Sequence, residues 1–156
     1  MARNLQIAVV GDSDPSPEVT QWAEEVGQLL AKGGAVVICG GLGGVMTAAA
    51  RGAAAQGGTT VGILPTYDVS TGNSSLSIVI PSGMGHARNM MVVAAGDAVI
   101  ALPGSYGTLS EVALALKLGK AVIGVNAWGD VKGVQAARSP SEAVTLALAA
   151  AHRLSD

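Results

Sequence analysis

The sequence is poor in the residues that define several familiar classes of protein. It has one cysteine among 156 residues, which excludes an internal disulfide and is typical of a reducing compartment. Charged residues make up 13%, the net charge is −2, and lysines and arginines are scattered, so no nucleic-acid partner is predicted. No run of 18 apolar residues occurs, and the apolar stretch near the start is too short for a signal peptide. We therefore expect a cytoplasmic protein without a membrane segment.

Aromatic residues are scarce as well. They make up 3% of the chain and include no phenylalanine, so the core cannot be built around large rings. Hydrophobic residues nevertheless reach 49%, and 22 glycines stand among them. Because glycine lets backbone approach backbone or a ligand closely, many tight turns are expected. The length is that of one domain, residues 1–156.

Short apolar runs alternate with longer helix-forming stretches. The runs IAVV, AVVIC, AVIAL and AVIGV are almost continuously apolar, which is typical of strands covered on both faces. Strands are predicted at 5–10, 35–39, 59–64, 76–80, 98–102 and 121–125, and helices at 17–32, 45–56, 87–95, 109–118 and 141–154. This alternation predicts an α/β fold, a Rossmann-like three-layer αβα sandwich with a mostly parallel central sheet. Ligands of such sheets bind at the carboxyl ends of the strands.

A glycine-rich segment, here called the first glycine turn, follows the predicted strand at 35–39. It reads GGLGG and stands directly before a predicted helix. Free backbone N–H groups and the positive end of the helix dipole favour phosphate at such a place. The candidate phosphate-binding residues are Gly40, Gly41, Gly43 and Gly44. A tight turn that needs glycine for its backbone conformation alone is the alternative.

A second glycine turn, PGSYGT at 103–108, has the same position after the strand at 98–102. Its candidate binding residues are Gly104, Ser105, Tyr106, Gly107 and Thr108. Thr108 and Glu111 have the spacing of a capping box, in which Glu111 would serve the helix N-terminus. Alternatively, the Glu111 carboxylate faces an uncharged or developing-cation part of a ligand. Both interpretations remain open at this point.

The end of the first strand and one arginine complete the candidate site. The strand ends in GDSD, and neither G-x-G-x-x-G after it nor a P-loop sequence is present, so ordinary use of NAD or ATP is not indicated. Gly11, Asp12 and Ser13 remain candidate ligand contacts because they lie at a strand end, and a plain turn is the alternative. Arg88 begins a predicted helix, where its charge opposes the dipole, so an anionic partner is expected. A surface ion pair is the alternative for Arg88.

Several other polar residues are interpreted as structural. His86 is ambiguous and is assigned to structure, and Cys39 lies in a buried-strand pattern. Asp97 opens a strand and is expected to contact neighbouring backbone. Lys117 and Lys120 lie at a helix end, where a positive charge complements the dipole. No metal site is predicted.

These segments together resemble the LOG superfamily, once labelled lysine decarboxylase-like. The signature Pro-Gly-Gly-x-Gly-Thr-x-x-Glu is matched at 103–111, with Ser105 in place of the second glycine, and the family's glycine-rich segment is matched at 40–46. Its arginine nine residues before a strand-opening aspartate is matched by Arg88 and Asp97. The phrases IPSGMGHARN and GTLSEVALALKLGKAVIGV resemble most the branch of molybdenum-cofactor carrier proteins. Typical LOG enzymes have Arg-Lys where this chain has Arg88 and Asn89.

The resemblance implies two functions for one site. As a binding or carrier protein, the chain would hold a phosphorylated pterin or nucleotide-like ligand, such as molybdopterin or molybdenum cofactor, with the loop at 65–75 over the ring. As an enzyme, it would hydrolyse nucleoside 5′-monophosphates to free base and ribose 5-phosphate. Arg88 would then orient the ligand and Glu111 would be the catalytic carboxylate. No lysine is placed as a pyridoxal Schiff-base site, so lysine decarboxylation is not predicted, and no cofactor is required.

The resemblance also implies a homo-oligomer, a dimer or a tetramer. The apolar, alanine-rich helices predicted at 45–56 and 87–95 are the candidate contact faces.

Overall fold

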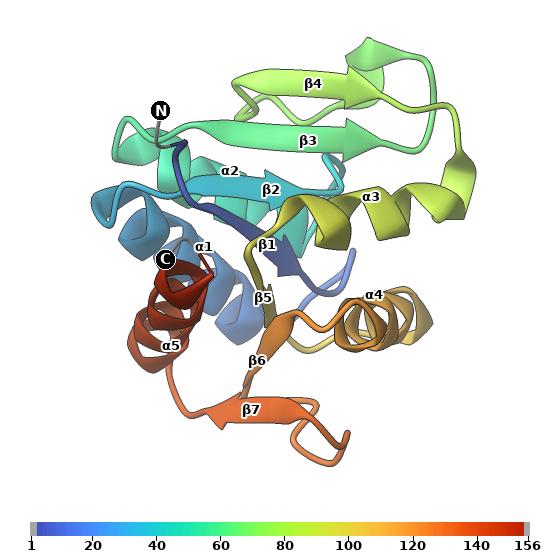
Figure 1. The fold of residues 1–156 in the computed structure, drawn as a ribbon. Coiled ribbons are helices and arrows are strands. Elements are labelled where there is room, and N and C mark those ends of the chain that lie inside the picture. Colours follow the sequence, from blue (N-terminus) through green and yellow to red (C-terminus); the bar gives the residue numbers. More distant parts are fainter. Residues whose placement is uncertain (1–2, 155–156) are drawn as a thin grey trace.

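The computed structural model describes residues 3–154 and has one central sheet (Figure 1). Within these residues, seven parallel strands lie in the order β4-β3-β2-β1-β5-β6-β7. The strands are Gln6–Val10 (β1), Val36–Cys39 (β2), Thr60–Leu64 (β3), Ile78–Pro81 (β4), Ala98–Ala101 (β5), Ala121–Val125 (β6) and Val134–Ala137 (β7). The helices are Pro17–Lys32 (α1), Val45–Ala55 (α2), Arg88–Ala95 (α3), Tyr106–Lys117 (α4) and Pro140–Arg153 (α5), with short 3-10 helices Val69–Thr71 (η1) and Gly85–Ala87 (η2). The predicted Rossmann-like α/β sandwich is confirmed.

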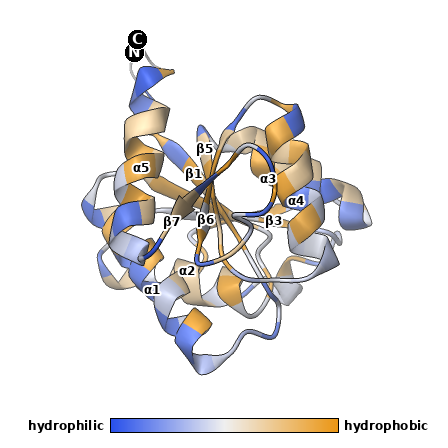
Figure 2. Ribbon diagram, turned by 90° about the horizontal axis from the view of Figure 1, so that it is seen from below, coloured by the Kyte–Doolittle hydropathy of each residue, from blue (hydrophilic) through white to orange (hydrophobic). Residues whose placement is uncertain are grey.

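The helices form a layer on each face of the sheet (Figure 2). Ile7 and Val9 of β1 belong to the core that α1, α2 and α5 build on one face. Ala8 and Val10 belong to the core that α3 and α4 build on the other. Successive side chains of a strand point to opposite faces, so both layers require a strand that is apolar throughout. Among the helices of residues 3–154, none combines the length and apolar character needed to cross a membrane.

The order of the strands reverses direction around β1. The chain builds outward from β1 to β4, then returns so that β5 pairs with the free side of β1, with Ile7 opposite Ala98. The loops that leave β2 and β5 therefore flank the loop that leaves β1. Such a topological switch point is where open parallel sheets bind ligands. Both glycine turns lie there because they follow β2 and β5.

Two elements differ from the predicted ones. Strand β7 has the sequence VQAA, lies at the sheet edge and has a half-exposed burial pattern, so it lacks the continuous apolar run by which the other strands were predicted. Helix α4 begins at Tyr106 rather than at 109, because Ser105 is its N-cap. The first turn of α4 thus includes residues of the second glycine turn.

Helices α1 and α2 pack against each other at unusually close range. A Cβ atom at Gly27 of α1 would lie 2.0 Å from the carbonyl oxygen of Ala49, and one at Gly52 of α2 would lie 2.0 Å from that of Glu24. Glycine at both positions lets the two backbones touch. Most of the apolar face of α2 is consequently covered within the chain itself.

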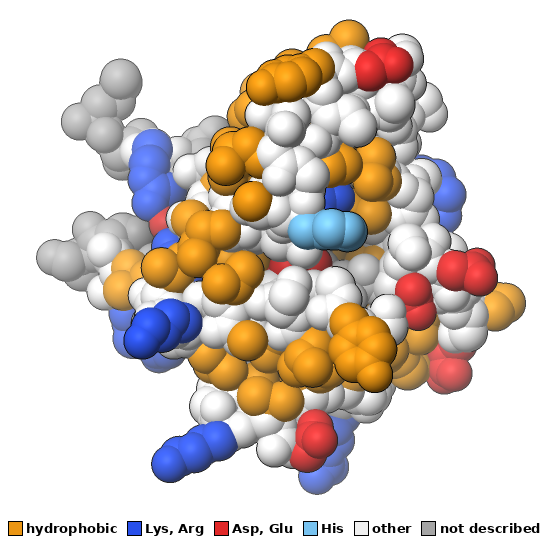
Figure 3. Space-filling model, turned by 90° about the vertical axis from the view of Figure 1, so that its right-hand side faces the viewer, with side chains coloured by type: hydrophobic (Ala, Val, Ile, Leu, Met, Phe, Trp, Pro, Cys, Tyr) orange, Lys and Arg blue, Asp and Glu red, His pale blue; other side chains and the backbone are white. Residues whose placement is uncertain are grey.

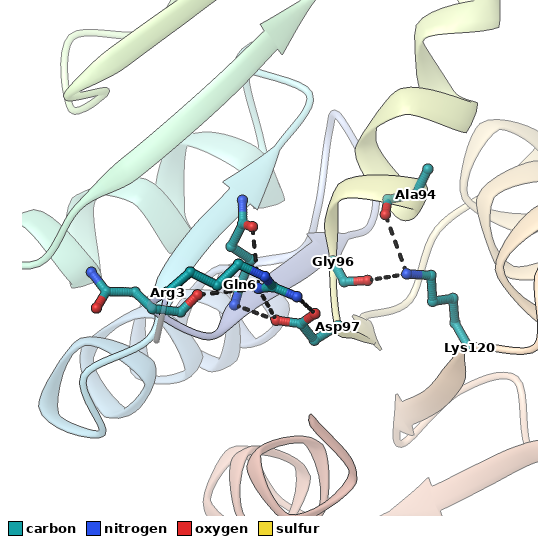
Figure 4. A network of polar contacts seen from close by, with 7 residues as sticks. Arg3, Gln6, Ala94, Gly96, Asp97 and Lys120 are labelled. Carbon is teal, nitrogen blue, oxygen red and sulfur yellow. Dashed lines mark hydrogen bonds and ion pairs between the residues drawn. The ribbon is translucent and has the colours of Figure 1, made fainter. Parts of the chain in front are cut away.

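Asp97 joins the amino-terminal ends of the strands on the side of the sheet away from the glycine turns (Figure 4). Its carboxylate accepts hydrogen bonds from the Arg3 guanidinium at 2.5 and 2.8 Å and from the Gln6 backbone N–H at 2.9 Å. Lys120 nearby donates to the carbonyl oxygens of Ala94 and Gly96, at the end of α3. The predicted backbone contact of Asp97 is confirmed, and the charge of Lys120 serves the end of the neighbouring helix.

We expect Asp97→Asn to lower the melting temperature at pH 7 by about 2–4 °C, because it removes an ion pair in which Arg3 is exposed and Asp97 is buried. The hydrogen bond and charge of Arg3 lower the pKa of Asp97 below its usual value. A lowered folded-state pKa stabilises above the unfolded pKa, and this contribution disappears as the pH falls through the folded value. The difference between variant and wild type, measured by thermal unfolding, should therefore shrink towards pH 3. An unchanged difference at pH 3 would contradict the assignment.

Candidate functional site

A cleft of about 180 Å³ opens at the carboxyl ends of β1, β2 and β5. Figure 3 looks onto this face, where hydrophobic side chains gather on both sides of a hollow in which acidic and basic side chains are visible. Residues of the three strand ends and of α2, α3 and α4 line the cleft: Val9, Val10, Gly11, Asp12, Ser13, Gly40, Leu42, Met46, His86, Arg88, Asn89, Ser105, Gly107, Thr108 and Glu111.

The cleft gathers most of the predicted site residues. Those that line it are Gly11, Ser13, Gly40, Arg88, Ser105, Gly107, Thr108 and Glu111; those that do not are Gly41, Gly43, Gly44, Gly104 and Tyr106. Gly44 has a positive φ of 67° and packs against the backbone of Asp12 and Ser13, so glycine is needed there for the turn. A Cβ at Gly104 would lie 2.1 Å from the Thr108 hydroxyl, and Tyr106 is 87% exposed.

Sequence reasoning assigned several lining residues no part in the site. Leu42, Met46 and Asn89 are sequence neighbours of predicted residues, so that adjacency was the available signal, whereas Asp12 was already a candidate ligand contact at the end of its strand. His86 was assigned to structure, yet it lies exposed in η2 and lines the cleft. Its position two residues before Arg88 was the signal that could have found it.

Helices α2 and α4 begin at the cleft without side-chain caps. Among the described residues, no side chain bonds to the first-turn N–H groups of either helix, and their N-cap residues are Gly44 and Ser105. By contrast, Ser16 caps α1 and Ser139 caps α5 through their hydroxyl oxygens, at 3.2 and 3.1 Å. Uncapped helix N-termini leave N–H donors and a partial positive charge available to an anion.

The backbone of Asp12 joins the two glycine turns. Its N–H donates to the carbonyl oxygen of Pro103 at 3.0 Å, and its carbonyl oxygen accepts from the N–H of Val45 at 2.9 Å. The loop after β1 is therefore fixed between the turn after β5 and the start of α2. The backbone of Asp12 thus brings the two turns close together, as the sequence predicted.

The loop at 65–75 supports the first glycine turn from outside the cleft. Asn73 donates its backbone N–H to Gly41 and its side-chain amide to Leu42, at 2.9 and 3.0 Å. No residue of 65–75 lines the cleft, although the sequence suggested this loop as its cover. Its role in the structure is to fix the backbone of residues 41 and 42.

Arg88 is buried on the floor of the cleft rather than in a surface ion pair. Its guanidinium donates to the carbonyl oxygens of Ile63 at 2.9 Å and Gly40 at 3.3 Å, and to the side-chain oxygen of Asn89. Burial lowers the pKa of Arg88, and the charge of Glu111 opposes that shift. The cation is thus fixed by neutral acceptors, in a cleft that Glu111 also lines.

Glu111 is the acidic group that faces this cation. The residue is 9% exposed, and its carboxylate accepts no hydrogen bond within residues 3–154, so its oxygens meet only the solvent of the cleft. Burial raises the pKa of Glu111 to about 7, against a smaller lowering by Arg88. Since α4 begins at Tyr106 with Ser105 as N-cap, Thr108 is inside the helix and the capping-box interpretation of Thr108 and Glu111 is wrong. A largely buried carboxyl that meets only cleft solvent is poorly stabilised in its charged form, and a ligand that donates a hydrogen bond would complete it.

Cys39 lies beneath the first glycine turn and is fully buried, as the strand pattern predicted. Burial raises the pKa of its thiol to about 11, so roughly one molecule in a thousand carries the reactive thiolate at pH 8. We expect native protein to resist 5,5′-dithiobis(2-nitrobenzoate) at pH 8 and urea-unfolded protein to react with one thiol per chain. Rapid labelling of native protein would show that this strand end opens.

Within residues 3–154, no three His, Cys, Asp or Glu side chains gather to hold a metal ion. The cleft instead offers main-chain N–H groups, one arginine and the carboxyl groups of Asp12 and Glu111. Fold and cleft together define a Rossmann-like protein with a candidate small-ligand site at the topological switch point.

Comparisons with known proteins assign the chain to a family. It belongs to the SLOG cluster4 family, whose model matches residues 4–153. The cytokinin riboside 5′-monophosphate phosphoribohydrolase of Mycobacterium tuberculosis is 32% identical over 83% of this chain and 75% of that protein. The molybdenum cofactor binding protein of Rippkaea orientalis is 36% identical with a TM-score of 0.90, over 96% of this chain and 98% of that one. The molybdenum cofactor carrier protein of Chlamydomonas reinhardtii is 30% identical with a TM-score of 0.88, over 95% and 98%. The resemblance to the LOG superfamily, near its molybdenum-cofactor carriers, is confirmed.

Proposed function

We propose that this protein binds or carries a phosphorylated pterin or nucleotide-like ligand, of which molybdenum cofactor or its molybdopterin part is the first candidate. The observation that carries the proposal is that two helices without side-chain caps begin at one cleft whose floor holds a buried arginine. A phosphate in this place would receive N–H donors from both glycine turns and the field of two helix dipoles and Arg88. The relatives that bind or carry molybdenum cofactor support the ring system proposed.

Glu111 narrows the class of ligand further. A buried carboxyl without a hydrogen-bond partner suits a ligand group that donates, such as a ribose hydroxyl or a pterin N–H. The cleft is smaller than the 300–1,000 Å³ or so of most small-molecule pockets, so it suits the phosphate and the adjoining group. The ring would then extend towards the rim, where His86 is exposed.

Hydrolysis of nucleoside 5′-monophosphates is the second candidate, and Glu111 favours it specifically. A pKa of about 7 suits a carboxyl group for proton transfer or water activation near neutral pH. In this reaction Arg88 would orient the phosphorylated sugar and Glu111 would act at the glycosidic bond. The phosphoribohydrolase relative supports this alternative.

One pair of measurements separates the two functions. Purified protein is incubated with AMP and other nucleoside monophosphates, and free base and ribose 5-phosphate are assayed; in parallel, its melting temperature is measured with molybdopterin. For a carrier we expect no base release, and a rise of about 5–10 °C at a molybdopterin concentration a hundred times the Kd. Turnover that Glu111→Gln abolishes would establish the enzyme instead. If the protein shows no turnover and no thermal shift, both functions are rejected.

We further propose that the protein is a cytoplasmic homo-oligomer that associates through the outer face of α3 and α4. Met90 of α3 and Leu109 of α4 are exposed there, as is Leu118 just after α4. Helix α3 was one of the two helices predicted for this role, whereas α2 is largely covered by α1. A monomeric mass in light scattering at micromolar concentration would reject the oligomer.

A further inference from the structure

A chain of hydrogen bonds crosses the floor of the cleft from the first glycine turn to the second. Arg88 donates to the Gly40 carbonyl oxygen at 3.3 Å and to the side-chain oxygen of Asn89. The Asn89 amide nitrogen donates to the Ser110 hydroxyl at 3.3 Å, and that hydroxyl donates to the Gly107 carbonyl oxygen at 2.6 Å. We call Arg88, Asn89 and Ser110 the cleft relay.

Only an amide meets the demands at the centre of this relay. The side chain of Asn89 must accept from a guanidinium, which has no acceptor, and donate to a hydroxyl whose hydrogen is already given to Gly107. A carboxylate could not donate to Ser110, and an apolar side chain could do neither. Asn89 is 4% exposed and its bond with Arg88 is buried, so water has little access to replace that bond.

The relay fixes backbone as well as side chains. Because the peptide unit is planar, the hydrogen bond that fixes the carbonyl of Gly107 also fixes the direction of the N–H of Thr108. Thr108 lies in the first turn of α4 and lines the cleft. Through these bonds, Asn89 couples the direction of the Thr108 N–H, a proposed anion donor in the second glycine turn, to the position of the Arg88 guanidinium beside the first.

We infer that Asn89 is a positioning residue, which sets the mutual placement of Arg88 and the second glycine turn so that both reach one phosphate group. This inference rests on the proposed phosphate binding. The side chain of Asn89 would act on phosphate binding through Arg88 and Ser110 rather than by contact with the ligand. This role also explains why an uncharged, buried amide lies among the charged groups of the cleft.

A double-mutant cycle tests the relay, with inorganic phosphate and AMP as probes in calorimetry at constant ionic strength. Asn89→Leu is expected to weaken phosphate binding about tenfold and Ser110→Ala about fivefold, the effect of losing one or two hydrogen bonds to a buried cation or carbonyl. Because the relay works as a unit, the double variant should lose no more than Asn89→Leu alone. Ser110→Thr retains the hydroxyl and should bind like wild type, and so should Ser141→Ala, a serine exposed on α5.

The NMR signals of the Arg88 guanidinium give a second measurement that requires no ligand. Its Nη protons should exchange faster with water in Ser110→Ala than in wild type and in Ser110→Thr, while the melting temperature stays nearly constant because Ser110 is exposed. The inference about Asn89 would be overturned if the losses of affinity multiplied in the double variant. It would also be overturned if Ser110→Ala left phosphate binding and the Arg88 signals unchanged. Neither result would touch the proposed function. A wild-type protein that binds neither phosphate nor AMP would overturn the proposed function, and the inference with it.

Discussion

Replacing Glu111 with glutamine is expected to raise the free energy of unfolding by about 2–3 kcal/mol at pH 8. The carboxyl group is buried, lacks a hydrogen-bond partner within residues 3–154, and has its pKa raised from 4.5 to about 7. Ionised Glu111 therefore destabilises the fold, and the neutral, nearly isosteric amide removes that cost. Such a gain from changing a site residue is typical of positions shaped for a ligand rather than for stability.

The stability difference between Glu111→Gln and wild type should depend on pH. A carboxyl group with a raised folded-state pKa binds its proton more tightly in the folded state than in the unfolded one. Its destabilising effect is absent below the unfolded pKa of about 4.5, develops between pH 4.5 and 7, and is complete above pH 7. The advantage of Glu111→Gln should accordingly be near zero at pH 4 and largest at pH 8.

Urea unfolding of wild type and variant at pH 4, 6 and 8 measures the effect. The matched control is Glu25→Gln, since Glu25 is an exposed glutamate on α1 and should show no such dependence. A Glu111→Gln variant that is less stable than wild type at pH 8 would mean that an interaction stabilises the ionised carboxylate, and the interpretation of an unpartnered acid would fail.

Gly52→Ala and Gly27→Ala are each expected to cost about 3 kcal/mol of stability. The added methyl group would lie 2.0 Å from a backbone carbonyl oxygen of the facing helix, of Glu24 in one case and of Ala49 in the other. Backbone cannot move aside as a flexible side chain can, so α1 and α2 would have to separate along their contact. Alanine usually stabilises a helix relative to glycine, and here the contact reverses that preference.

Gly107→Ala is the matched control for this pair. It is the same substitution within a helix, but the new Cβ would meet nothing within 4 Å. We expect its stability in urea to stay level or to rise by up to about 1 kcal/mol. If Gly52→Ala were as stable as Gly107→Ala, the close contact of α1 and α2 would not be real.

Much of the fold followed from local pattern. Continuous apolar runs between helical stretches define strands buried on both faces, and the parallel sheet with helices on both sides follows from connection rules. Strand β7 was missed because VQAA at an exposed edge needs no apolar run. The start of α4 was misjudged because Thr-x-x-Glu imitates a cap, whereas Ser105 is the N-cap.

The position of the cleft was predictable from the kinds of residue that follow the strands. Glycines after strands and the arginine before the second turn identify the place, since topology brings strand ends together. The contribution of each glycine was not predictable, because a glycine that exposes its N–H and one that permits a turn are the same residue in a sequence. Gly44, packed against Asp12 and Ser13, is of the second kind.

By itself, the sequence determined the α/β class, the family and the two glycine turns, because these depend on hydrophobic period and on residues that local backbone geometry requires. The tertiary structure alone decided that Glu111 is buried without a partner, that Asn89 links Arg88 to Ser110, and that α1 touches α2 at two glycines. These properties depend on distances between segments far apart in the chain, and burial and hydrogen bonding come into being only when those segments pack.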